Sequence, residues 1–277
     1  MLPGSVLRFA SLGLPLLTLW LCGCKSDTVS EKEAAFWKQL EERRQLISKD
    51  HPQAAGPTGS ATLRWDLSGQ KSWTYDYTHE QKDLGAPMVG AAAVLAVSSQ
   101  GDGTAHVALK DPVSMARGDE SAPPLQPVTV QGMKDDGRME VGDTLPERFL
   151  MLLFALPEGP LAVGKPVEAP ATLPFTVGGG TVSAAGAAKT VLTGYVEIDG
   201  RTCARIDTRL EVPDTDVAGK DGTYTCGASV RLISYFDIQD RGLVSAHLKL
   251  EMATAAKEPL PPTRRPTAAL VNLTRKR

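Results

Sequence analysis

The sequence has few of the residues that build catalytic or metal-binding sites. Its 277 residues include four histidines and four cysteines. No histidine shares a short ligand-spaced motif with another histidine or with a cysteine, which argues against a zinc site. No G-x-S-x-G motif is present, and the glycines at 178–180 do not precede a phosphate-binding helix pattern. We therefore expect neither an enzyme nor a bound cofactor.

A basic stripe that would bind nucleic acid is also missing. The formal net charge of the whole chain is −2. Residues 257–277 hold six basic residues and one acidic residue, so the remainder of the chain is clearly acidic. Binding to nucleic acid requires basic groups that neutralise phosphates. We therefore expect no nucleic-acid partner.

Long apolar runs are scarce, and the longest one lies at the N-terminus. Arg8 is the only charged residue before Lys25, and residues 9–23 are apolar or small. The apolar part is too short for a helix that spans a bilayer, which needs about 20 apolar residues. A charge followed by a short apolar run is the pattern of a secretory signal.

The run ends in Leu21-Cys22-Gly23-Cys24, which resembles the lipobox of bacterial lipoproteins. In that family a diacylglycerol is attached to the cysteine thiol and signal peptidase II cuts before it. The resemblance implies a signal peptide over 1–23, cleavage between Gly23 and Cys24, and a lipid-anchored protein of the cell envelope. An aspartate after the cysteine resembles an inner-membrane retention signal, so Lys25 favours the outer membrane. The alternative is an ordinary secretory signal, or an uncleaved anchor, with an incidental cysteine.

The chain after the cysteine begins with helical signals. Ser30-Glu31-Lys32-Glu33 forms a capping box that predicts a helix to about Lys49. The apolar residues of this segment fall near one stripe: Phe36, Trp37, Leu40 and Ile47. Residues 51–60 are rich in proline, glycine and small residues and predict a linker. Residues 24–60 therefore read as lipid anchor, helix and linker.

Residues 61–256 predict a mainly β domain. Leu63, Trp65 and Leu67 alternate with polar residues, and a similar alternation follows a Ser68-Gly69 turn, which predicts a hairpin. Further turns are marked by pairs that tolerate positive φ: Asp102-Gly103, Asp136-Gly137, Asp199-Gly200, Asp221-Gly222 and Arg241-Gly242. We expect an antiparallel meander that forms either a sandwich or a curved sheet.

Three segments stand apart from the meander. Residues 145–156 have Pro146 at a helix-start position and a nearly continuous apolar run, which predicts a short buried helix, with a buried strand as the alternative. The proline- and glycine-rich stretch 157–180 is a possible boundary between two β subdomains. Residues 257–277 contain four prolines and predict a flexible basic tail. That tail either is solvated or contacts anionic lipid headgroups, lipopolysaccharide or acidic glycan.

Cys203 and Cys226 remain once Cys22 leaves with the signal peptide and Cys24 carries lipid. An isolated pair in an exported protein usually forms a bridge, so we expect a disulfide between them. Simple alternation places the two cysteines on opposite strand faces. The bridge therefore requires a bulge, for which Gly227 is the candidate.

Three local patterns suggest chemistry but are incomplete. Residues 68–71 spell S-x-x-K without the S-D-N and K-T-G motifs of penicillin-binding enzymes, so we interpret them as a turn. Residues 214–219 begin like a calcium loop, but Ala218 and Thr225 occupy ligand positions. The charged residues at alternate positions of 203–211 indicate either a polar binding face or, more commonly, a solvated one. We expect no metal.

These observations favour a membrane-anchored envelope lipoprotein that acts as a non-enzymatic binding or structural module. Its partners would be the membrane, through the N-terminal lipid, and an envelope protein or glycan. The alternative is a carrier of lipid or other apolar cargo, in which a curved sheet encloses a cavity. That cavity would be lined by Phe149, Leu152, Leu153 and Phe154. A hydrolase remains a third hypothesis, because distant residues can assemble a site that no linear motif reveals.

Overall fold

Alternating apolar residues form the inner face of one large antiparallel sheet. The computed structural model describes residues 31–47, 50–118, 125–140, 145–257 and 264–277. Ten strands hydrogen-bond in the order β5-β4-β3-β2-β12-β11-β10-β9-β8-β7. They are β2 (Ser72–Asp83), β3 (Val89–Ser99), β4 (Ala105–Ala116), β5 (Val128–Met133), β7 (Pro166–Val177), β8 (Gly180–Ile198), β9 (Arg201–Ala218), β10 (Thr223–Asp237), β11 (Gly242–Ala256) and β12 (Arg264–Arg275). Two short strands, β1 (Ser60–Ala61) and β6 (Leu161–Ala162), pair separately.

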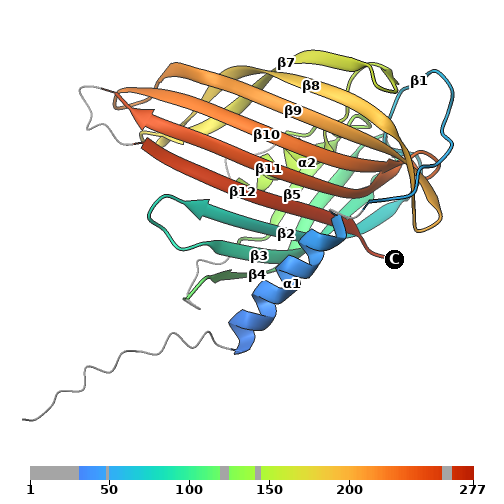
Figure 1. Cartoon of the computed structure of the whole chain (residues 1–277), viewed down its shortest axis with the longest axis horizontal. Coiled ribbons are helices and arrows are strands. Elements are labelled where there is room, and N and C mark those ends of the chain that lie inside the picture. The colour runs from blue at the N-terminus through green and yellow to red at the C-terminus, as the bar shows by residue number, and fades with distance from the viewer. Residues whose placement is uncertain (1–30, 48–49, 119–124, 141–144, 258–263) are drawn as a thin grey trace, which may run out of the picture.

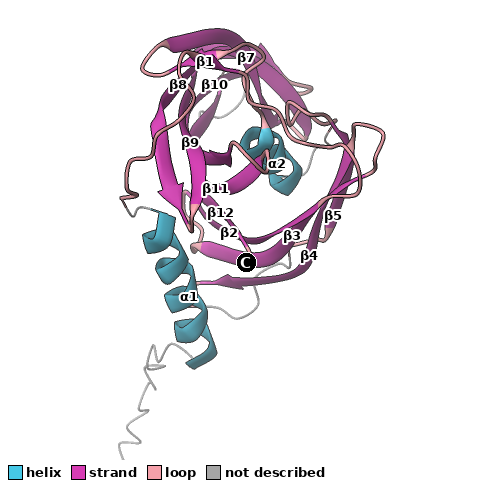
Figure 2. Cartoon of the chain, turned by 90° about the vertical axis from the view of Figure 1, so that its right-hand side faces the viewer, coloured by secondary structure: helices cyan, strands magenta, loops and turns pink. Residues whose placement is uncertain are grey.

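The sheet curls strongly but does not close (Figures 1 and 2). Its two edges are β5 and β7, which do not pair with each other. Shifts of register interrupt several ladders, for example between Leu192 and Gly194 of β8 and between Tyr235 and Phe236 of β10. Such bulges bend and twist a strand, which lets a long sheet wrap around its own core. The mainly β class is confirmed, and the architecture is a curved sheet and not a sandwich.

The predicted buried helix is confirmed as α2 (Leu145–Phe154), which lies inside the curl (Figure 2). Phe149, Leu150, Leu153 and Phe154 are each at most 1% exposed. The Asp136-Gly137 turn after β5 supports the end of the helix. Gly137 has a φ of 76°, and a Cβ there would lie 1.7 Å from the carbonyl oxygen of Phe154. Only glycine fits a backbone approach this close.

Aromatic side chains fill one end of the curl, called here the closed end. Trp65 packs against Trp73, Phe154 and Phe236, with ring centroids 5.4 to 5.8 Å apart. The segment around Trp65 is not the predicted hairpin arm, because it forms no ladder with β2. Instead the backbone N–H of Trp65 donates to the carbonyl of Asp135, and the backbone N–H of Asp66 donates to the carbonyl of Arg241. The alternation therefore correctly identifies buried side chains, but the segment covers the closed end as an extended chain.

The predicted N-terminal helix is α1 (Glu31–Ile47), which lies against the outer face of the sheet (Figure 2). Phe36 and Leu40 are buried there beside Gly90 of β3, where a Cβ would lie 2.7 Å from Leu40 Cδ1. The predicted linker 51–60 is not loose. The N–H of Ala54 donates to the Tyr195 carbonyl of β8 at 2.9 Å, so the segment is attached to the sheet.

The prediction of a flexible tail over 257–277 is wrong for residues 264–277, whereas residues 258–263 lie outside the described residues. Residues 264–275 form β12, a central strand between β11 and β2. Ala269, Val271 and Leu273 are each at most 2% exposed and belong to the core. Pro266 does not interrupt the ladder to β2, because that pairing begins one residue later.

The proposed subdomain boundary at 157–180 is also wrong. Half of this range is β7, which pairs with β8 along its whole length. Its prolines at 166, 170 and 174 are compatible with a strand because β7 is an edge, where one side of the backbone needs no partner strand.

The predicted disulfide is not formed, and Cys203 and Cys226 are buried free thiols. Cys203 pairs with Asp237, which lies eleven residues from Cys226 along β10. At about 3.3 Å per residue the two cysteines are roughly 35 Å apart. They also lie on opposite faces, since Cys203 packs in a small outer cluster and Cys226 in the main core. A bridge requires Cα atoms within about 7 Å.

We predict that both thiols react with a labelling reagent once the chain is unfolded, without any reductant. In the folded state neither should react quickly, because both are buried and burial raises the pKa of Cys203 to about 12. Mass spectrometry of a Cys22→Ser, Cys24→Ser chain counts the labels. Zero labels before reduction and two after it would show a bridge and contradict this structure.

Candidate functional site

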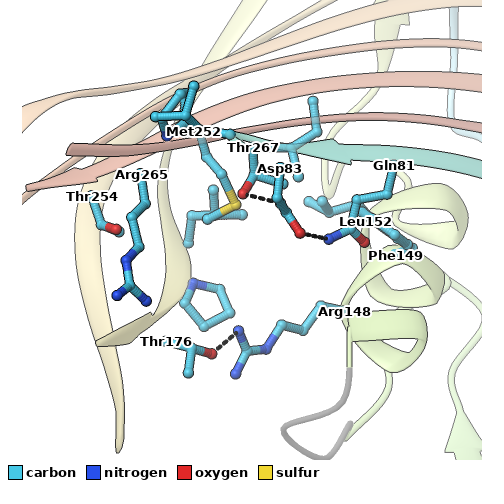
Figure 3. A pocket seen from close by; sticks show the side chains of 15 residues that line it. Gln81, Asp83, Arg148, Phe149, Leu152, Thr176, Met252, Thr254, Arg265 and Thr267 are labelled. Carbon is cyan, nitrogen blue, oxygen red and sulfur yellow. Dashed lines mark hydrogen bonds between the residues drawn. The ribbon is translucent and has the colours of Figure 1, made fainter. Parts of the chain in front are cut away.

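A cavity of about 760 Å³ lies between α2 and the concave face, at the end of the curl opposite the closed end (Figure 3). Its walls come from α2, from the last residues of β2 and β11, from the first residues of β12, and from β7. The lining residues are Gln81, Asp83, Leu84, Arg148, Phe149, Leu152, Leu173, Pro174, Thr176, Leu250, Met252, Thr254, Arg265, Pro266 and Thr267. Leu84 at the rim is 71% exposed, so the cavity opens to solvent.

The inner row of β2 explains why the curl is filled at one end and hollow at the other. Trp73, Tyr75 and Tyr77 are at most 2% exposed and occupy the core. The next inward residues toward the cavity are His79, Gln81 and Asp83, which carry shorter polar side chains. Because side chains alternate along a strand, this single row runs from bulky aromatic to small polar residues. The space that aromatic rings would fill stays open beyond His79.

One wall of the cavity is apolar. Phe149 and Leu152 of α2 face Leu250 and Met252 of β11, and Leu173 of β7 adds to the same surface. The unbranched thioether side chain of Met252 is flexible and adapts to ligands of irregular shape. This wall suits an apolar chain.

The other wall is polar and contains three charged side chains. Asp83 accepts hydrogen bonds from Thr267 Oγ1 at 2.6 Å and from Gln81 Nε2 at 2.9 Å. Arg148 is 8% exposed and donates to the hydroxyls of Thr176 at 3.3 Å and Thr181 at 3.1 Å. Figure 3 shows Arg265 entering from β12 on the side opposite Arg148.

His79 lies where the packed core meets the cavity. Its ring is 5.5 Å from that of Phe149 and 6.4 Å from that of Tyr77, measured between centroids. Burial lowers its pKa to about 4, and the neighbouring side chain of Gln81 opposes this lowering. The folded protein therefore holds a neutral imidazole beside the cavity at neutral pH.

We predict that His79 makes the protein less stable in acid. The unfolded chain binds a proton on this histidine below about pH 6.5, whereas the folded chain does so only near pH 4, so stability falls as pH falls between these values. The expected loss is roughly 3 kcal/mol in the free energy of unfolding. We expect the free energy of unfolding of the His79→Phe variant, measured by urea unfolding across this pH range, to lack this fall.

His106→Gln, a change on β4, controls for removal of a histidine as such. An unchanged pH dependence in His79→Phe would mean that the imidazole is already accessible to protons in the folded state.

The structure brings only part of the predicted cavity lining together. Phe149 and Leu152 line the cavity, as expected for a carrier, whereas Leu153 and Phe154 lie in the core. The predicted lipidation and cleavage residues, Gly23 and Cys24, lie outside the described residues. The sequence analysis missed Arg148 and Arg265, because no linear pattern relates a helix residue to a strand residue 117 positions later.

The incomplete motifs take part in local structure. Lys71 Nζ and Ser68 Oγ both donate to the Asp66 carboxylate at 2.5 Å. These hydrogen bonds lower the pKa of Asp66, and the bond from Lys71 has the larger effect. Residues 68–71 thus stabilise a turn. In the calcium-like segment, Asp216 accepts hydrogen bonds from Lys257 and from Thr225, which lower its pKa.

The charged strand face of 203–211 lies on the outside of the sheet. Asp207 pairs with Arg231 at 3.1 Å, and Glu211 accepts a hydrogen bond from Ser229 at 2.8 Å. Within the described ranges, no group of three or more histidine, cysteine, aspartate or glutamate residues has the arrangement of a metal site. A second hollow of about 610 Å³ shares Asp83, Leu84 and Met252 with the cavity, and extends to outward residues such as Lys82 and Glu251.

Comparison of the chain with models of known protein families and with curated protein sequences gives no match. In the part of the chain that the structure describes, neither helix has the length and apolarity needed to cross a bilayer.

Proposed function

We propose that this protein is a lipid-anchored envelope protein that carries a small apolar or amphipathic molecule in the cavity between α2 and the sheet. The observation that carries the proposal is the cavity itself. Sites for small ligands are concave, mostly apolar and about 300–1,000 Å³ in volume. A cavity of about 760 Å³ with an apolar wall and a few polar groups fits this description. A purely structural module has no need of such a hollow.

The position of α1 supports exchange of the ligand with a membrane. Trp37 of α1 packs under the guanidinium of Arg117, which lies 5.2 Å from the ring centroid. The N–H of Arg117 donates to the carbonyl of Met88, in the turn that begins at Leu84 on the rim of the cavity. The N-terminal half of α1 and the cavity opening therefore share one end of the molecule.

The proposed anchor is close to this end along the chain. Cys24 precedes Glu31, the first described residue, by seven positions. Seven residues span at most about 25 Å, so a lipid on Cys24 would keep the opening near the membrane surface. The exposed Leu84 at the rim suits contact with a lipid phase. Lys25 favours the outer membrane as the site of attachment.

We predict that Leu152→Trp fills the cavity and prevents ligand binding. Leu152 is half-buried and its side chain faces the hollow, so a larger ring has room without entering the core (Figure 3). Native mass spectrometry of the purified mature protein should detect a bound amphiphile on the wild type and at least about tenfold less on the variant, since most of the apolar contact area is lost.

Val113→Trp is the matched control, because Val113 is 52% exposed and lies outside the cavity lining. It should retain the ligand. Equal occupancy in Leu152→Trp and Val113→Trp would place binding elsewhere, and an empty wild-type protein after extraction and incubation with fatty acids would reject the carrier function.

We predict that Cys24→Ser abolishes lipid attachment and processing, because serine lacks the thiol that receives the diacylglycerol. The precursor should then stay about 2 kDa heavier than the mature chain, apart from the lipid, as expected for a leader of typical length. Mass spectrometry of the N-terminus measures this, with Cys22→Ser as the control that should still be processed. A mature chain that begins at another residue would exclude the lipid anchor.

A further inference from the structure

We infer that the cavity selects an amphiphile with one apolar chain and an anionic headgroup, held between Arg148 and Arg265. This inference rests on the proposed function, since it specifies which ligand the cavity takes. The shared chemistry is a carboxylate or phosphate on an alkyl chain, as in a fatty acid or a monoalkyl phosphate.

Two guanidinium groups converge on the polar wall from different elements. Arg148 lies in the first turn of α2, whereas Arg265 lies near the start of β12. Figure 3 shows both side chains at the same hollow, with Thr254 beside Arg265 and Thr176 beside the Arg148 guanidinium. Guanidinium forks match the geometry of carboxylate and phosphate oxygens. An oxyanion placed there can accept from both arginines and from the threonine hydroxyls.

The charge of the lining favours an anion. Arg148, Arg265 and Asp83 are the charged residues among the described residues that line the cavity, which leaves a net charge of +1. The Asp83 carboxylate already accepts hydrogen bonds from Thr267 and Gln81, so it is oriented toward its own strands. The two guanidinium groups supply the positive charge of this lining.

The arrangement also sets the direction of the ligand. Arg265 and Thr176 are exposed and mark the outer part of the cavity, whereas Phe149 and Leu250 are buried at its inner part. A headgroup at the arginines would therefore lie toward the opening, with the alkyl chain pointing inward along α2. A volume of about 760 Å³ lies within the range of small-ligand sites and suits a single-chain ligand.

The test is a competition measured by native mass spectrometry on the full mature protein. Equimolar dodecanoate and dodecanol, then dodecyl phosphate and dodecanol, are offered below their micellar concentrations. The wild type should prefer each anion over the alcohol by about tenfold or more, as expected for a charge-assisted hydrogen bond. Comparison of the carboxylate with the phosphate tells which headgroup fits better.

Arg265→Gln is the decisive variant, because this exposed side chain can be shortened without disturbing the core. It should lose most of the preference for the anion while it binds dodecanol as before. Lys82→Gln removes one positive charge from the same end of β2 on the outer face and should keep the preference. Arg148→Gln, checked for unchanged thermal unfolding, should lower anion binding further.

Three outcomes separate the hypotheses. If neither anion nor alcohol binds the wild type, the proposed carrier function fails. If all three bind equally and Arg265→Gln changes nothing, the apolar cavity stands and the anion preference is overturned. If Lys82→Gln and Arg265→Gln lose the preference to the same extent, the effect is a general surface charge and the assignment to the two arginines is wrong.

Discussion

The pairing of β12 with β2 is the constraint on which the rest of the structure depends, since it joins two meanders that are distant in sequence. Asn272 of β12 lies in register with His247 of β11 and Thr78 of β2. Its amide contacts both, at 2.5 Å from His247 Nδ1 and 3.2 Å from Thr78 Oγ1, and is 2% exposed. A slip by one residue would break these contacts and turn Val271 outward. The cavity exists only because this junction brings β2 and β11 to the same concave face.

The contrast between the two ends of the curl follows from which side chains the strands supply. At the closed end Trp73 donates its indole N–H to Asp240 at 3.0 Å, and Arg275 forms an ion pair with the same carboxylate at 2.5 Å. Buried rings and paired charges pack together there. At the opposite end, where the cavity lies, Gln81 and Asp83 take the positions along β2 that aromatic rings would occupy. The hollow therefore follows from the side chains that these strands supply at this end of the sheet.

Local patterns predicted most elements but not how they meet. The apolar run 145–156 identified α2, and pairs such as Asp199-Gly200 identified turns, because these signals depend on neighbouring residues; both of these residues have positive φ. The strand β12 was missed because four prolines outweighed the alternation of Ala269, Val271 and Leu273, and a central strand depends on partners far along the chain. Two of the four predicted lining residues, Phe149 and Leu152, line the cavity. The other two could not be assigned from the sequence, because the curl of the sheet decides which face of α2 lines the hollow.

The helix α2 links the core to the cavity through its own periodicity. Leu150, Leu153 and Phe154 are buried in the core and do not line the hollow. Arg148 and Leu152, four residues apart, share the face that lines it, together with Phe149. The chain reaches α2 from one sheet edge, β5, and leaves it toward the other, β7, so the helix lies where the edges fail to pair. Because its buried face is fixed by the aromatic core, its other face is held in place before any ligand enters. A ligand therefore meets a preorganised wall, and less binding free energy is lost in ordering it.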